Sequence, residues 1–203
     1  MSEFKKNVKE LFAGCLAIPN LLSVIRILLI PVFAVLFLQE HYFIAIAVII
    51  FAELTDLFDG MIARKFNQVS ALGKILDPIA DKLSQISIIV VLIVKYWDNA
   101  IKYLFMFFII KEIIMLIGGA ILISKGLRPV AAEMWGKVAT TVFCIVMIFV
   151  LAFGEGGAFC QYFELPSVVT WILVSISAVC TFGSLLGYIP GFVRQIKEKK
   201  AAK

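Results

Sequence analysis

The sequence contains a single histidine, His41, and four cysteines that lie far apart in the chain. No two cysteines form a Cys-x-x-Cys pair, and zinc sites normally recruit histidine or cysteine, so a zinc enzyme is not expected. Charged residues make up only 16% of the chain. No polar stretch is long enough to form a soluble domain, and the basic residues are scattered, so a nucleic-acid partner is not expected either.

Apolar residues, in contrast, are abundant. They make up 62% of the 203 residues, whereas about half is usual in soluble domains, and the mean hydropathy is +1.02. The apolar runs are about 20 residues long, the length of a transmembrane helix, and they lack the alternation of a membrane β-barrel. Since backbone polar groups in a bilayer must be satisfied internally, the sequence predicts an all-α integral membrane protein.

One membrane domain over residues 1–203 is expected, with a six-helix bundle at 20–189. The predicted transmembrane helices cover about 20–38, 43–66, 72–96, 103–124, 138–153 and 168–189. Residues 2–17 place apolar and lysine side chains on opposite helical faces, which predicts an amphipathic interfacial helix. A signal peptide or a lipoprotein site at Cys15 would need a longer apolar run before it. Pro190 and Gly191 are expected to end the last helix and to begin a basic tail, 190–203.

The distribution of lysine and arginine predicts the orientation. One side of the membrane receives the basic residues of 5–9, 64–74, 125–137 and 194–203, and the other receives only Lys95 and Lys102. The positive-inside rule then places both termini and the turn near residue 70 in the cytoplasm of a cell-membrane protein. The net charge of +5 suits anionic lipid headgroups and anionic substrates.

Four aspartates, Asp56, Asp59, Asp77 and Asp81, lie within 26 residues of each other in two of the predicted membrane helices. A charged side chain near the middle of such a helix costs about 2.5–3.5 kcal/mol, so the four need a compensating cation. Carboxylate oxygens favour hard ions, namely Mg²⁺, Mn²⁺ or Ca²⁺.

Helical spacing puts Asp56 and Asp59 on one face and Asp77 and Asp81 on another. The short turn between the two helices makes them antiparallel neighbours, so the carboxylates can converge from facing walls. Pro78 should bend the second of these helices. Residues that would let a ligand approach the backbone, or would hold it at the cytoplasmic mouth, are Gly60, Ala63, Gly73 and Arg64.

Four carboxylates around one point indicate two divalent ions. A pair of ions about 3.5–4 Å apart is a standard clamp for phosphoryl transfer, and one carboxylate could instead accept a proton from an attacking hydroxyl. A structural cation site, or buried pairs of aspartate with arginine or lysine in a cation transporter, is the alternative.

The spacing Asp-x2-Asp-Gly-x2-Ala-Arg-x8-Gly-x3-Asp-x3-Asp resembles the signature of the CDP-alcohol phosphatidyltransferase family at all eight fixed positions. The segments Ile18-Pro-Asn-Leu-Leu-Ser-Val-Ile-Arg26, Leu72–Lys82 and Met134-Trp-Gly-Lys137 are similar to the phosphatidylglycerophosphate synthase and eukaryotic-type cardiolipin synthase branches. The resemblance covers roughly residues 18–150.

The resemblance implies six transmembrane helices, a homodimer and catalysis at the cytoplasmic side. It implies that two Mg²⁺ or Mn²⁺ ions bind Asp56, Asp59, Asp77 and Asp81, with Asp81 also acting as general base. An acceptor hydroxyl would attack the phosphorus that bears diacylglycerol in CDP-diacylglycerol, and CMP would leave. The residues implied to line the CDP group are Asp56, Gly60, Ala63, Arg64 and Gly73.

Four cations outside the signature are candidates for holding an anionic acceptor: Arg26, Lys111, Arg128 and Lys137. Glycerol 3-phosphate is the favoured acceptor, and phosphatidylglycerol, as in a cardiolipin synthase, is the alternative. Arg26 could instead hold a carboxylate or snorkel to the interface, and the other basic residues could serve topology alone. The role of Glu53 stays open, and a cation transporter or a non-catalytic relative is a third reading.

Overall fold

A computed structural model describes residues 18–65, 73–124 and 134–201, and all statements below concern these ranges. The side chains of residues 18–19, 56–65, 73–75, 123, 134, 192 and 196–201 are not described. The predicted interfacial helix at 2–17 and Arg128 lie outside the described residues. The regular elements of the described ranges are helices: α2 (Ile18–Leu38), α3 (Tyr42–Lys65), α4 (Gly73–Lys95), α5 (Lys102–Ser124), α6 (Met134–Phe153) and α7 (Ser167–Ala201).

The all-helical prediction is confirmed, and the first five helices lie close to their predicted bounds. Within the described ranges, four stretches are long and apolar enough to cross a membrane: Asn20–Leu38, Lys102–Leu122, Trp135–Phe153 and Ser167–Gln195. In α3 a shorter stretch, Tyr42–Thr55, is apolar. This stretch ends where the described side chains of α3 end, so the count of six spans stays a prediction.

The last helix corrects the sequence interpretation. Pro190 was expected to end it, but α7 continues through Pro190 to Ala201. A proline removes one backbone hydrogen bond, which a long helix can lose, and it tends to kink a helix rather than to stop it. Strong helix formers, among them Arg194, Gln195 and Lys197, follow the proline and favour continuation.

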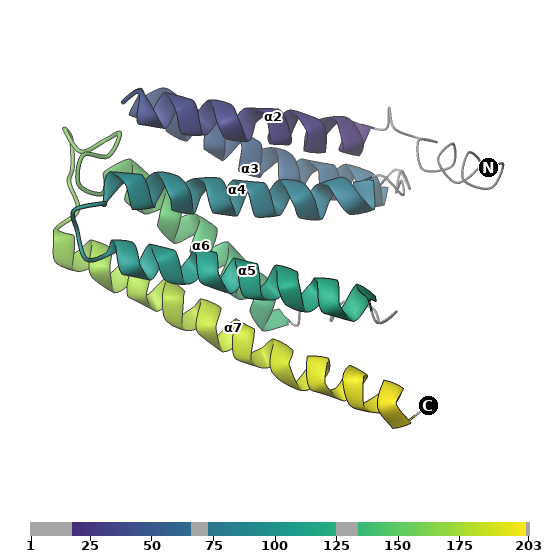
Figure 1. Cartoon of the computed structure of the whole chain (residues 1–203). Coiled ribbons are helices and arrows are strands. Elements are labelled where there is room, and N and C mark those ends of the chain that lie inside the picture. Colours follow the sequence, from purple (N-terminus) through teal and green to yellow (C-terminus); the bar gives the residue numbers. More distant parts are fainter. Residues whose placement is uncertain (1–17, 66–72, 125–133, 202–203) are drawn as a thin grey trace. The chain divides into compact units, whose positions relative to one another are not determined.

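The helices fall into two compact units, Met1–Val91 and Leu92–Lys203, and the boundary lies within α4. In the first unit α2 and α3 pack side by side along their length (Figure 1). The turn between them places Glu40 at φ 65°, and the N–H of His41 reaches the carbonyl of Leu36 at 2.9 Å. This is a Schellman-type helix end, in which the left-handed position usually carries glycine.

The buried face of α2 changes character along the helix. The C-terminal half of α2 is apolar, and Ile30, Phe33 and Phe37 are buried there. The Phe37 ring packs edge-on against Tyr42 of α3, with the ring centroids 4.8 Å apart. The first three turns of α2 bury polar groups instead, namely Asn20, Ser23 and Arg26. Because polar groups away from water must be paired, this end of α2 requires polar partners on a neighbouring helix.

In the second unit α7 packs against α6 and α5. Aromatic rings take part in these contacts, including Phe107 of α5 with Phe182 of α7, whose ring centroids are 6.3 Å apart. The connection from α6 to α7 begins with a tight turn at 154–157, where the N–H of Gly157 donates to the carbonyl of Gly154 at 2.7 Å. The turn leaves no room for larger residues, because a Cβ on Gly157 would lie 2.6 Å from the carbonyl oxygen of Ala152.

Candidate active site

The polar face of α4 carries two of the four aspartates. Asp77 and Asp81 are one helical turn apart, so their carboxylates lie on the same side of the helix. Ser84 continues this face and is 2% exposed. The predicted common face of Asp77 and Asp81 therefore agrees with the helix that the structure gives.

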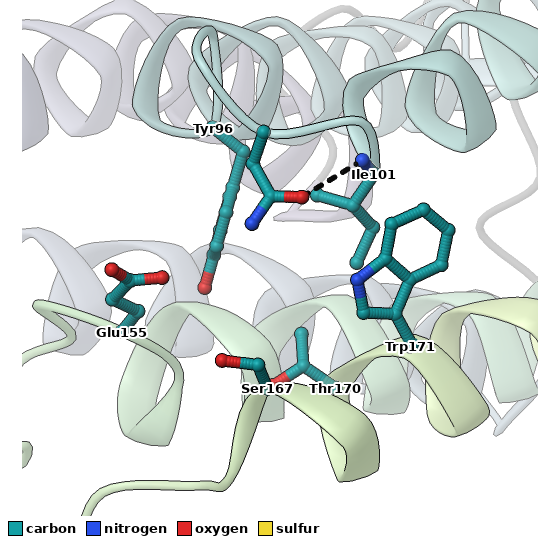
Figure 2. A pocket seen from close by; sticks show the side chains of 7 residues that line it. Tyr96, Ile101, Glu155, Ser167, Thr170 and Trp171 are labelled. Atoms are coloured by element: carbon teal, nitrogen blue, oxygen red, sulfur yellow. Dashed lines mark hydrogen bonds between the residues drawn. The ribbon is translucent and has the colours of Figure 1, made fainter.

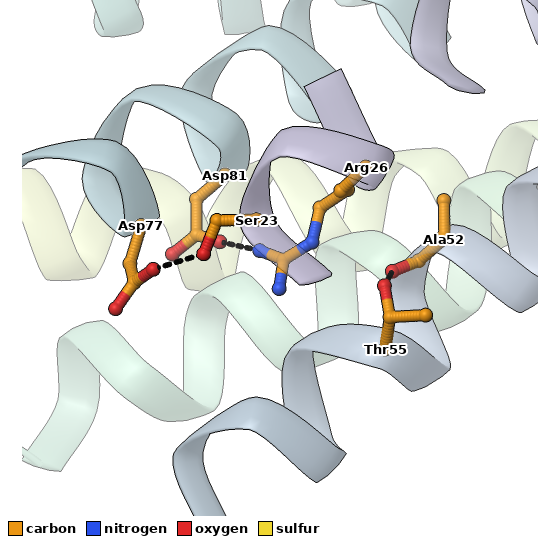
Figure 3. A network of polar contacts seen from close by, with 6 residues as sticks. All are labelled: Ser23, Arg26, Ala52, Thr55, Asp77 and Asp81. Atoms are coloured by element: carbon orange, nitrogen blue, oxygen red, sulfur yellow. Dashed lines mark hydrogen bonds and ion pairs between the residues drawn. The ribbon is translucent and has the colours of Figure 1, made fainter. Parts of the chain in front are cut away.

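The buried polar turns of α2 provide partners for both carboxylates (Figure 3). The Ser23 hydroxyl donates a short hydrogen bond of 2.5 Å to Oδ1 of Asp77. The Arg26 guanidinium donates to Oδ1 of Asp81 at 2.8 Å. The partners are 54 and 55 residues apart in the sequence, so the fold, not local geometry, brings them together.

Burial is very uneven across the ion pair. The Arg26 side chain is 1% exposed, whereas that of Asp81 is 44% exposed. The guanidinium thus approaches the carboxylate from the protein interior and leaves its other side open. Of the two alternatives for Arg26 in the bundle, a phosphate or a carboxylate, the structure shows a carboxylate contact.

The other signature residues lie at helix positions whose side chains are not described. Asp56, Asp59, Gly60, Ala63 and Arg64 lie on the last three turns of α3, and Gly73 is the first residue of α4. Just before them, the Thr55 hydroxyl donates to the carbonyl of Ala52 within α3. The convergence of all four carboxylates is therefore still a prediction.

The donor set fits a hard divalent cation. Among the described side chains, no three of His, Cys, Asp and Glu form a metal-binding group, but Asp56 and Asp59 are not among them. Asp77 and Asp81 offer only oxygen ligands, and each accepts a hydrogen bond at Oδ1. Carboxylate oxygens are the ligands that Mg²⁺ and Mn²⁺ prefer.

The candidate acceptor cations are in different environments. Lys111 donates to the carboxylate of Glu112, its neighbour in α5, and the side chains of the pair are 13% and 4% exposed. Lys137 of α6 is exposed. A pair of consecutive residues compensates its charge locally, so the structure gives no geometric reason to prefer Lys111 as an acceptor contact.

A small cavity with polar lining residues lies in the second unit, near the connection from α4 to α5 (Figure 2). Tyr96, Asn99, Glu155, Thr170 and Trp171 line a cavity of about 10 Å³, enough for one water molecule. The Asn99 side chain accepts a hydrogen bond from the Ile101 N–H, which caps the start of the α5 region. This cavity is too small for a substrate, so the candidate site is the aspartate cluster.

A comparison with protein families decides the assignment. The model of the CDP-alcohol phosphatidyltransferase family matches residues 16–183, which include α2 with Ser23 and Arg26 and the whole aspartate signature. The chain belongs to the CDP-alcohol phosphatidyltransferase family. The resemblance inferred from the eight signature positions is thereby confirmed, and so is the interpretation of the chain as an enzyme of this type.

Relatives from two branches of the family resemble the chain. It is 31% identical over 89% of its length to the CDP-diacylglycerol–glycerol-3-phosphate 3-phosphatidyltransferase of Aquifex aeolicus, of which 99% is covered. The enzyme of the same name from Haemophilus influenzae is 29% identical over 85% of this chain and 91% of its own. The CMP-forming cardiolipin synthase of Homo sapiens is 51% identical, but only over 36% of this chain and 25% of its own.

Sequence reasoning did not single out Ser23, although its hydroxyl contacts a signature aspartate. The available signal was its position three residues before Arg26, on the same face of a helix that is otherwise strongly apolar. Because polar side chains in a strongly apolar helix need polar partners, two of them on one face indicate such partners on a neighbouring helix.

Proposed function

We propose that the protein transfers the phosphatidyl group of CDP-diacylglycerol to sn-glycerol 3-phosphate, forming phosphatidylglycerophosphate and releasing CMP. The observation that carries the proposal is the likeness, over nearly the whole chain, to relatives named for this reaction. Family membership and the complete set of four aspartates support it against a transporter or a non-catalytic relative.

In the proposed reaction, Asp81 accepts the proton of the acceptor hydroxyl. The hydroxyl oxygen forms a bond to the phosphorus that bears diacylglycerol, and the bond from this phosphorus to the bridging oxygen breaks. The bridging oxygen leaves as part of CMP. Asp56, Asp59, Asp77 and Asp81 would hold two Mg²⁺ or Mn²⁺ ions, which supply positive charge to the pyrophosphate oxygens. Asp56, Gly60, Ala63, Arg64 and Gly73 would line the CDP group.

The membrane arrangement is part of the proposal. The proposal of six spans, with both termini and the aspartate site on the cytoplasmic side, is supported by the apolar helices and by the basic residues near the expected ends of the spans. A water-soluble acceptor and the departing CMP would then exchange with the cytoplasm, while diacylglycerol stays in the lipid. We expect a homodimer, as the family resemblance implies.

Acceptor binding is proposed to involve Lys111, Arg128 and Lys137. Glycerol 3-phosphate is small and doubly charged, so it needs cations at the open side of the site. Lysine offers a point charge rather than the planar fork of arginine, so Lys111 would hold a phosphate less rigidly than an arginine would.

A second candidate function is cardiolipin synthesis, with phosphatidylglycerol as the acceptor. It is supported by the high local identity to the human cardiolipin synthase. The 75 residues matched make up only about a third of this chain, so the support is local.

CMP release by the purified protein tests the proposal. The protein is given CDP-diacylglycerol and Mg²⁺ or Mn²⁺, with glycerol 3-phosphate or with phosphatidylglycerol. We expect CMP with glycerol 3-phosphate and little with phosphatidylglycerol. CMP with phosphatidylglycerol alone would establish the second function, and no CMP with either acceptor would contradict both.

A further inference from the structure

We propose that Ser23 and Arg26 of α2 are positioning residues for the aspartate site. Ser23 orients Asp77 as a cation ligand, and Arg26 holds Asp81 in place beside the reacting groups. The use of the site in phosphatidyl transfer rests on the proposed function, whereas the orientation of the carboxylates by α2 does not.

The directions of the two contacts support this role. Ser23 is 0% exposed and Arg26 is 1% exposed, so both donors reach the carboxylates from the interior. Ser23 donates to Oδ1 of Asp77 and Arg26 to Oδ1 of Asp81, and in Figure 3 the second oxygen of Asp77 points away from Ser23. A ligand carboxylate that is hydrogen-bonded on its far side is the usual arrangement by which a protein orients a metal ligand.

The spacing of the two contacts makes them act together. Ser23 and Arg26 are three residues apart on α2, and Asp77 and Asp81 are four residues apart on α4. The two residues of each pair therefore lie on the same face of their helix, one turn apart. A rotation of α2 would break both contacts at once. The two helices therefore fix both carboxylates with a single packing arrangement.

Ser23 differs from four other hydroxyls in these helices. Thr55, Ser124, Thr140 and Thr141 donate to a carbonyl three or four residues earlier in their own helices. This is the ordinary way for a helical Ser or Thr to satisfy its hydroxyl without a partner elsewhere. Ser23 instead donates to a carboxylate on another helix, which is expected of a group that serves that carboxylate.

Arg26 is a weaker candidate for the acceptor phosphate than the sequence suggested. Its guanidinium is buried and donates to Asp81, whereas a phosphate contact needs donors that reach the open side of the site. Arg26 also offsets the negative charge of Asp81 within an apolar helix bundle.

Mn²⁺ binding without substrates tests Ser23, since the EPR signal of free Mn²⁺ reports binding directly. Ser23→Ala is expected to weaken Mn²⁺ affinity by about 10-fold or more, as the loss of outer contacts to metal ligands does elsewhere. Ser23→Thr, which keeps the hydroxyl, should bind nearly as the unmodified protein does. Ser84→Ala is the matched control, because Ser84 is buried on the same face of α4 and its hydroxyl has no hydrogen-bond partner among the described residues.

Equal Mn²⁺ affinity of Ser23→Ala and the unmodified protein would overturn the role of Ser23. An equal loss in Ser84→Ala would do the same, because any buried hydroxyl would then suffice, and so would a failure of the unmodified protein to bind Mn²⁺. If Mn²⁺ binds but no acceptor yields CMP, the proposed function fails while the positioning role stands.

A kinetic measurement tests Arg26. Arg26→Gln is expected to lower kcat by about 10-fold or more and to leave KM for glycerol 3-phosphate nearly unchanged. Arg26→Lys should recover part of kcat, because lysine keeps the charge but lacks the planar fork. A rise in KM for glycerol 3-phosphate at unchanged kcat would overturn this role and return Arg26 to the acceptor site.

Discussion

Two ion pairs of the described helices differ in how their partners meet. Arg26 and Asp81 come from α2 and α4 and are 55 residues apart, whereas Lys111 and Glu112 are consecutive in α5. In the first pair the arginine is buried and the aspartate is partly open, and in the second both side chains are largely buried. The first pair depends on the fold and presents a carboxylate to the site; the second compensates its charge locally.

This difference separates the well-supported part of the site from the part that is only proposed. The aspartates of α4 have long-range partners and a family signature, which together indicate one reaction type. Of the candidate acceptor cations, Lys111 is paired with its neighbour in sequence, Glu112, and Arg128 lies outside the described residues. Mutations at the two pairs should therefore differ in their effects.

The largest expected effect is on catalysis at the first pair. Asp81→Asn removes the proposed proton acceptor and should lower kcat by about 10²- to 10⁴-fold, while CDP-diacylglycerol binding is largely retained. Turnover is followed by CMP release and binding by displacement of labelled CDP-diacylglycerol. Asp98→Asn, in the exposed connection after α4, is the control and should stay active. Activity that survives in Asp81→Asn would show that another group accepts the proton.

The second pair should matter more for stability. Lys111→Gln leaves the buried Glu112 carboxylate without this partner, and such a loss typically costs about 3–5 kcal/mol. The double variant Lys111→Gln with Glu112→Gln should recover most of the stability, because no charge is then left behind. Thermal unfolding of the purified protein in detergent measures both. If the double variant is no more stable than Lys111→Gln, local charge compensation is not the function of this pair.

A smaller effect is expected at the turn after α6, remote in sequence from both pairs. A Cβ on Gly154 would lie 2.5 Å from the Tyr96 hydroxyl and 2.5 Å from the Val150 carbonyl oxygen. Gly154→Ala should therefore destabilise the protein by about 1–3 kcal/mol, as overpacking does. Gly119→Ala is the matched control, since nothing lies within 4 Å of its Cβ position. Equal melting temperatures of the two variants would contradict the described packing of this turn.

The smallest expected effect is a gain in stability at the turn between α2 and α3. Glu40 has a left-handed backbone conformation, φ 65°, which costs a residue with a Cβ about 1 kcal/mol relative to glycine. Glu40→Gly should raise the melting temperature slightly without changing kcat. Glu40→Ala, which keeps the Cβ, should not, and a gain with alanine would assign the effect to the lost charge instead.

The sequence predicts the helices well because membrane helices are marked by long apolar runs, and α2 to α6 begin and end close to their predicted bounds. It also predicts the shared face of Asp77 and Asp81, because helical spacing alone determines it. The end of α7 was predicted wrongly, since Pro190 is only one of several local preferences and the residues after it favour helix.

The partners of the aspartates could not be predicted in the same way. Ser23 meets Asp77 and Arg26 meets Asp81 only because the fold brings α2 and α4 within reach of each other's side chains, and nothing in the spacing within either helix encodes these contacts. The signature locates the carboxylates, and tertiary packing determines what orients them.

A competition between the two acceptors tests the central claim most directly. CDP-diacylglycerol labelled in its diacylglycerol is given to the purified protein with Mn²⁺ and equal amounts of glycerol 3-phosphate and phosphatidylglycerol, and the labelled lipids are identified by mass spectrometry. The proposed function predicts that the label moves to phosphatidylglycerophosphate while CMP is released. Label found only in cardiolipin, or left in CDP-diacylglycerol, would contradict it.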